Sequence, residues 1–214
     1  MFDALGQLAR ATYINLDSRT DRLAHIEALF SDAIWHPDRT SAVRYDALTD
    51  NVSVRHKTRG AVAVASIWQS HKNVLCEFLD NEEDGLFVTL EDDLRMKKSF
   101  WESVFPSLPD DWRMLMVSPR YRTRASDDMP GSRDFVPPPH GSNPVHLPEM
   151  NAEYHCTGAH FLIFRNKSAV QSIVHEMDCI RDVYDVDVFF SELHGVYGYN
   201  NDSIGAGGFG SDHV

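Results

Sequence analysis

Cysteine is scarce in this chain, and its three copies argue against a disulfide framework. Cys76, Cys156 and Cys179 are odd in number and far apart, and no CxxC pair is present, so a zinc knuckle is not expected either. No apolar stretch approaches the roughly 20 residues that cross a bilayer, and the first residues lack the apolar run of a signal peptide. The sequence therefore predicts a soluble, cytoplasmic protein, with peripheral attachment to a membrane left open.

Basic residues are also few, because 20 Lys and Arg stand against 32 Asp and Glu and give a net charge of -12. A nucleic-acid partner is not expected, since a phosphate backbone favours basic surfaces. An anionic substrate would need a bound cation or a few well-placed arginines. A length of 214 residues with 43% hydrophobic content predicts one α/β domain that spans the whole chain, 1–214.

The apolar periodicity predicts strands that alternate with helices around a mostly parallel central sheet. Strands are expected at 11–16, 86–90, 113–117 and 157–164, with a short one near Val43, and helices after Asp17, over 60–79, after Asn166 or Ser168, and over 185–193. The irregular, proline-rich region at about 118–150 is expected to be a loop that covers the site or forms its acceptor-side wall.

An acidic triplet, Glu91-Asp92-Asp93, follows the clearest strand, Leu86–Leu90. Three adjacent carboxylates repel one another, and a divalent cation with a preference for oxygen ligands, Mg²⁺ or Mn²⁺, relieves that repulsion. A solvated turn is the simpler interpretation of a charge run. The position of the triplet after a buried strand favours a binding site, because ligands in open α/β sheets lie outside the carboxyl ends of the strands.

Motifs in the same order as those of glycosyltransferase family 25 extend over nearly the whole chain. Tyr13–Arg22 resembles the opening strand of that family, Ser70-His71 its helical Ser-His pair, and Leu90–Asp93 its LEDD motif. Thr157–Ile163 with the later Val186-Asp187 resembles its penultimate segment, and Ser211-Asp212 its closing pair. The chain thus resembles the lipopolysaccharide-biosynthesis and collagen-galactosyltransferase type of enzyme.

This resemblance implies a GT-A-like fold and an inverting transfer of a hexose, galactose or glucose, from a UDP-sugar to a hydroxyl of a glycan or glycoconjugate. It also implies Mn²⁺ or Mg²⁺ as cofactor and lipopolysaccharide biosynthesis as a setting. Asp93 would be the main metal ligand, and Glu91 and Asp92 would support the metal and the donor ribose.

Three residues of the first motif, Asn15, Arg19 and Arg22, would lie near the nucleotide or its phosphates. The planar fork of an arginine suits phosphate. Ion pairing of Arg19 and Arg22 with Asp17 or Asp21 is the alternative for either arginine.

Three histidines and a serine are further members of the predicted site. Ser70 and His71 would shape the donor side, although a histidine on an apolar helix face is more often a core residue. His160 either points into the cleft or packs within a strand. His213 is a candidate second metal ligand, because enzymes of this fold class often use a late His or Asp. A frayed terminus is the alternative for that residue.

Asp187 is the predicted catalytic base, with Asp185 as the second choice. An inverting transferase needs one carboxylate or histidine to take the proton of the acceptor hydroxyl. A helix cap is the structural alternative for a carboxylate at this place.

Two other functions fit the same pattern. One is a catalytically inactive nucleotide-sugar-binding protein of the same fold. The other is a metal-dependent nucleotidyltransferase, which the absence of a GxxxxGK[ST] loop makes less favoured.

Overall fold

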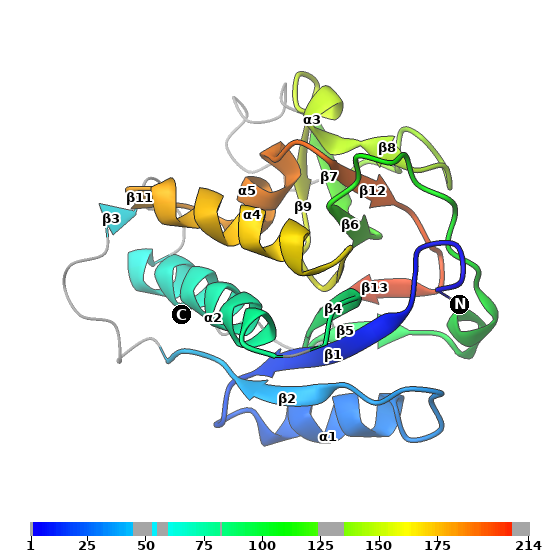
Figure 1. The fold of residues 1–214 in the computed structure, drawn as a ribbon. Helices are drawn as coiled ribbons and strands as arrows, with labels where there is room; N and C mark the ends of the chain where they lie inside the picture. Colours follow the sequence, from blue (N-terminus) through cyan, green and yellow to red (C-terminus); the bar gives the residue numbers. More distant parts are fainter. Residues whose placement is uncertain (1, 45–52, 55–59, 82, 124–134, 207–214) are drawn as a thin grey trace.

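A computed structural model of the chain describes residues 2–44, 53–54, 60–81, 83–123 and 135–206. They form one α/β domain around a seven-stranded sheet with the strand order β2-β1-β4-β10-β6-β12-β8 (Figure 1). The strands of this sheet have the following bounds: β1 Leu8–Asn15, β2 Asp38–Ser41, β4 Leu86–Glu91, β6 Met114–Val117, β8 Val145–His146, β10 Phe161–Phe164 and β12 Val196–Tyr199.

Five of these strands, β1, β2, β4, β6 and β12, run in one direction, whereas β10 and β8 run against them. The prediction of a mostly parallel central sheet in an α/β domain is therefore confirmed. The antiparallel β10 lies between β4 and β6, so its first residue lies at the edge where those two strands end.

Smaller elements surround the central sheet. Three two-stranded ladders pair β3 Ser53–Val54 with β11 Asp182–Val183, β5 Leu94–Met96 with β13 Ile204–Ala206, and β7 Arg120–Thr123 with β9 Tyr154–Thr157. The helices are α1 Thr20–Leu29, α2 Ala61–Leu79, α3 Leu147–Met150, α4 Lys167–Cys179 and α5 Val186–Glu192, with a 3-10 helix, η2, at Lys98–Glu102.

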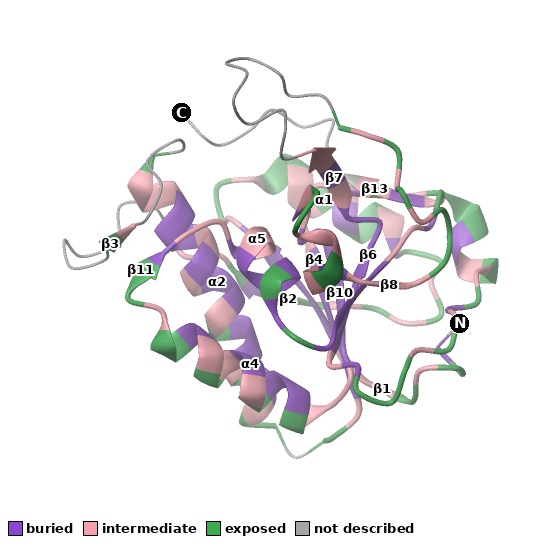
Figure 2. Ribbon diagram, turned by 90° about the horizontal axis from the view of Figure 1, so that it is seen from above, coloured by how far each residue is buried: buried purple, intermediate pink, exposed green. Residues whose placement is uncertain are grey.

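Alternating side chains of the central strands build a hydrophobic core on each face of the sheet. Phe87 of β4 packs on the face covered by α2, α4 and α5, where its ring stacks on Phe78 of α2 with centroids 4.3 Å apart. Val88 belongs to the opposite face, where Ile26 of α1 and Phe100 of η2 complete the core. The buried strands therefore form the centre of the molecule, as the burial colouring shows (Figure 2).

Helix α4 follows the sequence signals directly. Asn166 is its N-cap, and the side-chain oxygen of Asn166 accepts a hydrogen bond from the backbone N–H of Ala169 at 2.9 Å. The apolar residues Val170, Ile173 and Met177 are buried at helical spacing. The predicted helices over 60–79 and 185–193 correspond to α2 and α5.

One predicted strand, 157–164, is wrong, because the structure divides this segment into the end of β9 and the whole of β10. Gly158 separates them with a φ of +104°, a left-handed conformation that breaks an extended strand. The region 118–150 also contains regular structure, since β7, β8 and α3 lie within it. The short strand expected near Val43 lies slightly earlier, as β2.

None of the helices in the described parts of the chain is both long enough and apolar enough to cross a membrane.

Candidate functional site

Polar residues from five neighbouring strand ends meet at one edge of the central sheet, which we call the carboxyl edge. Asn15, Glu91 and Ser118 stand at or directly after the ends of β1, β4 and β6, and Asn201 follows β12. His160 directly precedes the antiparallel β10 and so reaches the same edge. The sheet topology alone therefore gathers residues that are far apart in the sequence at the place where α/β sheets bind ligands.

Asp92 is the carboxylate of the triplet whose charge the protein itself compensates. It is 6% exposed, and its Oδ1 accepts a hydrogen bond from Nη1 of Arg22 at 2.8 Å. Its Oδ2 accepts one from Nδ2 of Asn15 at 2.7 Å. Nε of Arg39 in turn donates to Oδ1 of Asn15 at 3.1 Å, and Arg39 also pairs with Asp17. Asp92 thus ties β1 and α1 to the end of β4.

These contacts show where the residues of the first motif lie. Arg22 pairs with Asp92 rather than with Asp17 or Asp21. Arg19 makes the local ion pair, since its Nε and Nη2 donate to Asp21 at 2.9 and 2.8 Å. The roles of Asn15, Arg19, Arg22 and Asp92 in donor binding stay predictions.

Glu91 points toward two histidines and is held ionised by its surroundings. Its Oε1 lies 3.6 Å from Nε2 of His71, which is nearly fully buried in α2. Burial by itself would raise the pKa of Glu91, but His71, with smaller contributions from His160 and Arg120, brings that pKa below its usual range. His71 is therefore a buried residue that also contacts the carboxylate cluster.

Asp93 differs from its two neighbours because its Oδ1 is buried and has no hydrogen-bond partner among the described residues. Burial and the negative charge of Glu91 raise the pKa of Asp93, and Arg22 and Arg120 offset part of that rise. A buried acceptor without a donor is unfavourable in an isolated chain. A cation would satisfy this oxygen and relieve its repulsion with Glu91.

His160 is 1% exposed, and neither of its ring nitrogens makes a hydrogen bond of normal geometry within the described residues. Its pKa is lowered to about 4, chiefly by burial, while the charge of Glu91 acts in the opposite direction, together with a weaker interaction with the backbone of Ser118. The imidazole is therefore neutral at pH 7. Gly158 makes room for it, because a Cβ at position 158 would lie 2.8 Å from Cε1 of His160.

Asp187 lies in the first turn of α5 and holds the segment that carries His160. Its Oδ2 accepts a hydrogen bond from the backbone N–H of Gly158 at 2.8 Å, and its Oδ1 accepts one from that of Val188 at 2.9 Å. A carboxylate oxygen can accept more than one hydrogen bond, so these two contacts fix the direction of the Asp187 side chain without defining its protonation. Asp185, the second choice for the base, is the N-cap of the same helix.

Ser70 connects elements rather than facing the carboxylates. Its Oγ donates to the backbone oxygen of Ser66 at 2.7 Å and accepts from the backbone N–H of Val43 at 2.8 Å. Ser70 therefore attaches the segment after β2 to α2.

Ser118 and Asn201 are residues of the carboxyl edge that the sequence did not point to. Ser118 has a φ of +52°, a conformation that costs about 1 kcal/mol or more for a residue other than glycine. Its Oγ donates to the backbone oxygen of Asn201 at 2.8 Å and accepts from the N–H of Asn201 at 3.0 Å. This double contact joins the ends of β6 and β12.

Arg120 is the other residue that the sequence did not reveal. It begins β7, two residues after Ser118, and its positive charge lowers the pKa values of Glu91 and Asp93. The signal that could have found it is the positive charge that an anionic substrate requires in a chain this acidic.

The residues present fit a divalent cation held mostly by its substrate. In the described part of the chain, no three His, Cys, Asp or Glu side chains come together as a complete metal site. Mg²⁺ in phosphate-transfer sites commonly takes one or two carboxylates together with phosphate oxygens, and Asp93 with Glu91 matches that donor set. His213, the predicted second ligand, lies outside the described residues.

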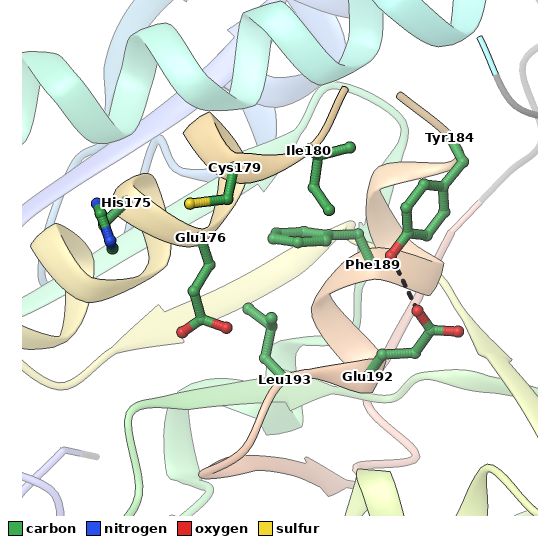
Figure 3. A pocket seen from close by; sticks show the side chains of 8 residues that line it. All are labelled: His175, Glu176, Cys179, Ile180, Tyr184, Phe189, Glu192 and Leu193. Atoms are coloured by element: carbon green, nitrogen blue, oxygen red, sulfur yellow. Dashed lines mark hydrogen bonds between the residues drawn. The ribbon is translucent and has the colours of Figure 1, made fainter. Parts of the chain in front are cut away.

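Two hollows on the surface lie away from this cluster. One, of about 420 Å³, is formed by α4 and α5 around Phe189, with Oη of Tyr184 donating to Glu192 at 2.9 Å (Figure 3). The other, of about 270 Å³, lies at the opposite edge of the sheet, beside Arg113 and Arg165. None of the residues that line them belongs to the carboxylate cluster.

Comparisons with known proteins give weak structural similarities, among them the two that follow. No protein-family model matches the chain, and no curated protein is similar to it. A nucleoside-diphosphate-sugar pyrophosphorylase from Vibrio cholerae RC9 has 9% identity and a TM-score of 0.41, with 92% of this chain and 75% of that one covered. Mouse xyloside xylosyltransferase 1 in its apo form has 13% identity and a TM-score of 0.33, with 85% and 67% covered. Similarities this low do not assign an activity to the chain.

Proposed function

We propose that the chain is a metal-dependent, inverting glycosyltransferase with a GT-A-like fold that moves a hexose from a UDP-sugar to a hydroxyl of a glycan or glycoconjugate. The observation that carries the proposal is the difference in environment between the carboxylates of the acidic triplet. The charge of Asp92 is compensated by Arg22, and Asn15 donates a further hydrogen bond to it, whereas Oδ1 of Asp93 is buried beside an ionised Glu91 and has no partner among the described residues.

This arrangement suits a nucleoside diphosphate better than a neutral ligand. A divalent cation bound at Asp93 and Glu91 supplies positive charge for the diphosphate and stabilises the leaving group. His71 orients Glu91, with its Nε2 3.6 Å from Oε1. The strand order supports the fold assignment, since the carboxylates stand at the edge where parallel strands end.

Asp187 is the base that we propose for the acceptor hydroxyl. Two backbone N–H groups fix the direction of its carboxylate, which pre-organises it for proton transfer. The neutral His160 lies close to Gly158, the residue that Asp187 holds. In this proposal, His160 contributes a polar group that carries no charge at pH 7 to the same edge of the sheet.

The first experiment is a panel of UDP, GDP, CMP and dTDP sugars, with Mn²⁺, with Mg²⁺ and with a chelator. We expect UDP-galactose or UDP-glucose to raise the melting temperature most and to release UDP only when the metal is present. UDP release that persists in excess chelator would contradict the metal assignment.

The product separates the alternatives. Pyrophosphate formed from a nucleoside triphosphate and a sugar phosphate would identify a nucleotidyltransferase instead. A UDP-sugar that stabilises the fold without any turnover, across a broad acceptor panel, would identify an inactive binding protein.

A further inference from the structure

Two arginines on β7, Arg120 and Arg122, form no ion pair with a carboxylate within 4.0 Å among the described residues. Five other described arginines form ion pairs, among them Arg22 with Asp92 at 2.8 Å and Arg113 with Glu176 at 2.5 Å. On β7 the buried Nε of Arg122 lacks even a neutral hydrogen-bond acceptor within the described residues.

The two arginines share one face of the β7/β9 ladder. Tyr121, between them, is fully buried and points into the core, as does its partner Cys156 on β9. Because side chains alternate along a strand, Arg120 and Arg122 point the other way, to the outer face. Both arginine side chains are partly exposed on that face.

An aromatic ring joins the two cations. The guanidinium carbons of Arg120 and Arg122 lie 5.3 and 4.5 Å from the centroid of the Phe135 ring, and Phe135 is 43% exposed. The ring attracts each cation, but the two positive charges repel each other. An anion placed between them would relieve the repulsion and supply the acceptor that Arg122 lacks.

The cationic face lies next to the carboxyl edge. Arg120 begins β7 two residues after Ser118, and a Cβ at position 158 would lie 3.8 Å from its backbone nitrogen and 2.8 Å from Cε1 of His160. Alternate residues of a strand are about 6.6 Å apart, so Arg122 lies one such step further from Arg120 along β7. A ligand that reaches from the carboxylates along β7 would thus meet Arg120 first and Arg122 second.

We propose that the outer face of β7, with Arg120, Arg122 and Phe135, binds the acceptor, and that the acceptor is an acidic saccharide that carries a carboxylate or a phosphate. This proposal rests on the proposed transferase function, and it names the acceptor class for that site. The planar forks of the arginines bind the acidic group, and the exposed ring of Phe135 packs against the apolar face of the sugar.

The test compares three probes of similar shape: methyl β-galactoside, methyl β-galacturonide and galactose 6-phosphate. Their binding to the full chain is measured by calorimetry at low salt, with and without UDP and Mn²⁺. We expect at least one acidic sugar to bind about tenfold more tightly than the neutral one, and added KCl to reduce that difference. The stronger of the two acidic probes identifies the group as carboxylate or phosphate.

The matched variants are Arg122→Gln and Arg181→Gln, which remove the same charge at β7 and at an exposed position after α4. We expect Arg122→Gln to lose about tenfold in affinity for the acidic sugar and little for the neutral one, and Arg122→Lys to restore part of the loss. Arg181→Gln should behave as the wild type. Melting temperatures of all three variants show whether a loss of affinity reflects unfolding.

Equal binding of acidic and neutral sugars, or equal behaviour of the two glutamine variants, would overturn the inference. Acidic preference without any donor turnover would instead overturn the proposed transferase and leave an acidic-saccharide site on β7. Turnover of the donor without a preference for acidic sugars would contradict only the proposed acceptor class and would leave the proposed transferase function standing.

Discussion

The two ends of the central sheet treat their polar groups in opposite ways. At the edge opposite the carboxylates, Nη1 of Arg113 donates to Glu176 and Ser172, at 2.5 and 2.6 Å. Its Nε donates to the backbone oxygen of His194 at 2.7 Å. At the carboxyl edge, Oδ1 of Asp93 and both ring nitrogens of His160 are buried and make no hydrogen bond of normal geometry among the described residues.

This difference in hydrogen bonding indicates that one edge of the sheet contributes to stability and the other to ligand binding. A hydrogen-bond network such as that of Arg113 stabilises the fold, and its donors are already used within the protein. Unsatisfied buried groups lower stability and persist in natural proteins mainly at functional sites. The opposite edge therefore serves the fold, and the carboxyl edge is the place to look for chemistry.

The largest effect is expected at Asp93. Asp93→Asn should reduce metal-dependent UDP release at least about 100-fold, because the proposed cation loses its main ligand. The melting temperature should stay the same or rise, since the carboxylate that is removed has a raised pKa and its buried Oδ1 has no hydrogen-bond partner in the described part of the chain. Steady-state kinetics and a thermal melt of the same sample check both parts, and full activity would contradict the site.

Asp92, the adjacent carboxylate, should give the opposite pattern. Asp92→Ala leaves Arg22 and Asn15 without their acceptor, and removal of one partner from a buried ion pair costs about 4 kcal/mol. Urea denaturation measures this loss, and activity per folded molecule should fall less than in Asp93→Asn. An Asp92→Ala variant as stable as the wild type would show that Asp92 does not have the structural role assigned to it.

His160 should make the protein sensitive to acid. Its folded pKa of about 4 lies below the unfolded value near 6.5, so the unfolded state binds the proton first. Stability is therefore fully present above pH 6.5 and falls by about 3 kcal/mol as the pH drops to 4.

The matched variant for this prediction is His160→Gln, which cannot gain a proton. Its unfolding free energy should lose less than that of the wild type over the same pH range. Glu91, whose pKa is lowered chiefly by His71, adds its own acid-dependent loss in both proteins, and only the smaller part that His160 contributes to that shift differs between them. If the unfolding free energies of the two proteins fall in parallel as the pH is lowered, His160 is protonated more easily in the folded state than its burial indicates.

Arg113 gives the smallest effect and tests the opposite edge. Arg113→Met should lower the unfolding free energy by about 2 kcal/mol, because a charged hydrogen-bond network is lost at a partly exposed place. UDP release per folded molecule should not change. A loss of activity at constant stability would mean that the two edges are not independent.

The elements predicted best are those whose signals are local. The apolar run Leu86–Leu90 and the turn residues before it correctly predict the buried β4. Asn166 correctly marks the start of α4, because a side-chain cap acts within three residues. The position of the acidic triplet at the end of β4 follows from the first of these signals.

What the sequence did not predict depends on distant contacts or on a single backbone angle. The pairing of Arg22 with Asp92 joins residues 70 positions apart, and no spacing rule contains it. The apolar run 157–164 looks like one strand, and only the left-handed Gly158 divides it. Arg120 begins a strand inside a proline-rich region that the composition identified as a loop.

Gly158 also has a mechanical consequence. Its N–H is held by Asp187 of α5, and the missing Cβ leaves the space that the ring of His160 occupies. The proposed base, the turn at Gly158 and the buried imidazole of His160 are thus mechanically coupled. A displacement of α5 is expected to move the imidazole relative to Glu91, and a methyl group at position 158 would collide with the imidazole.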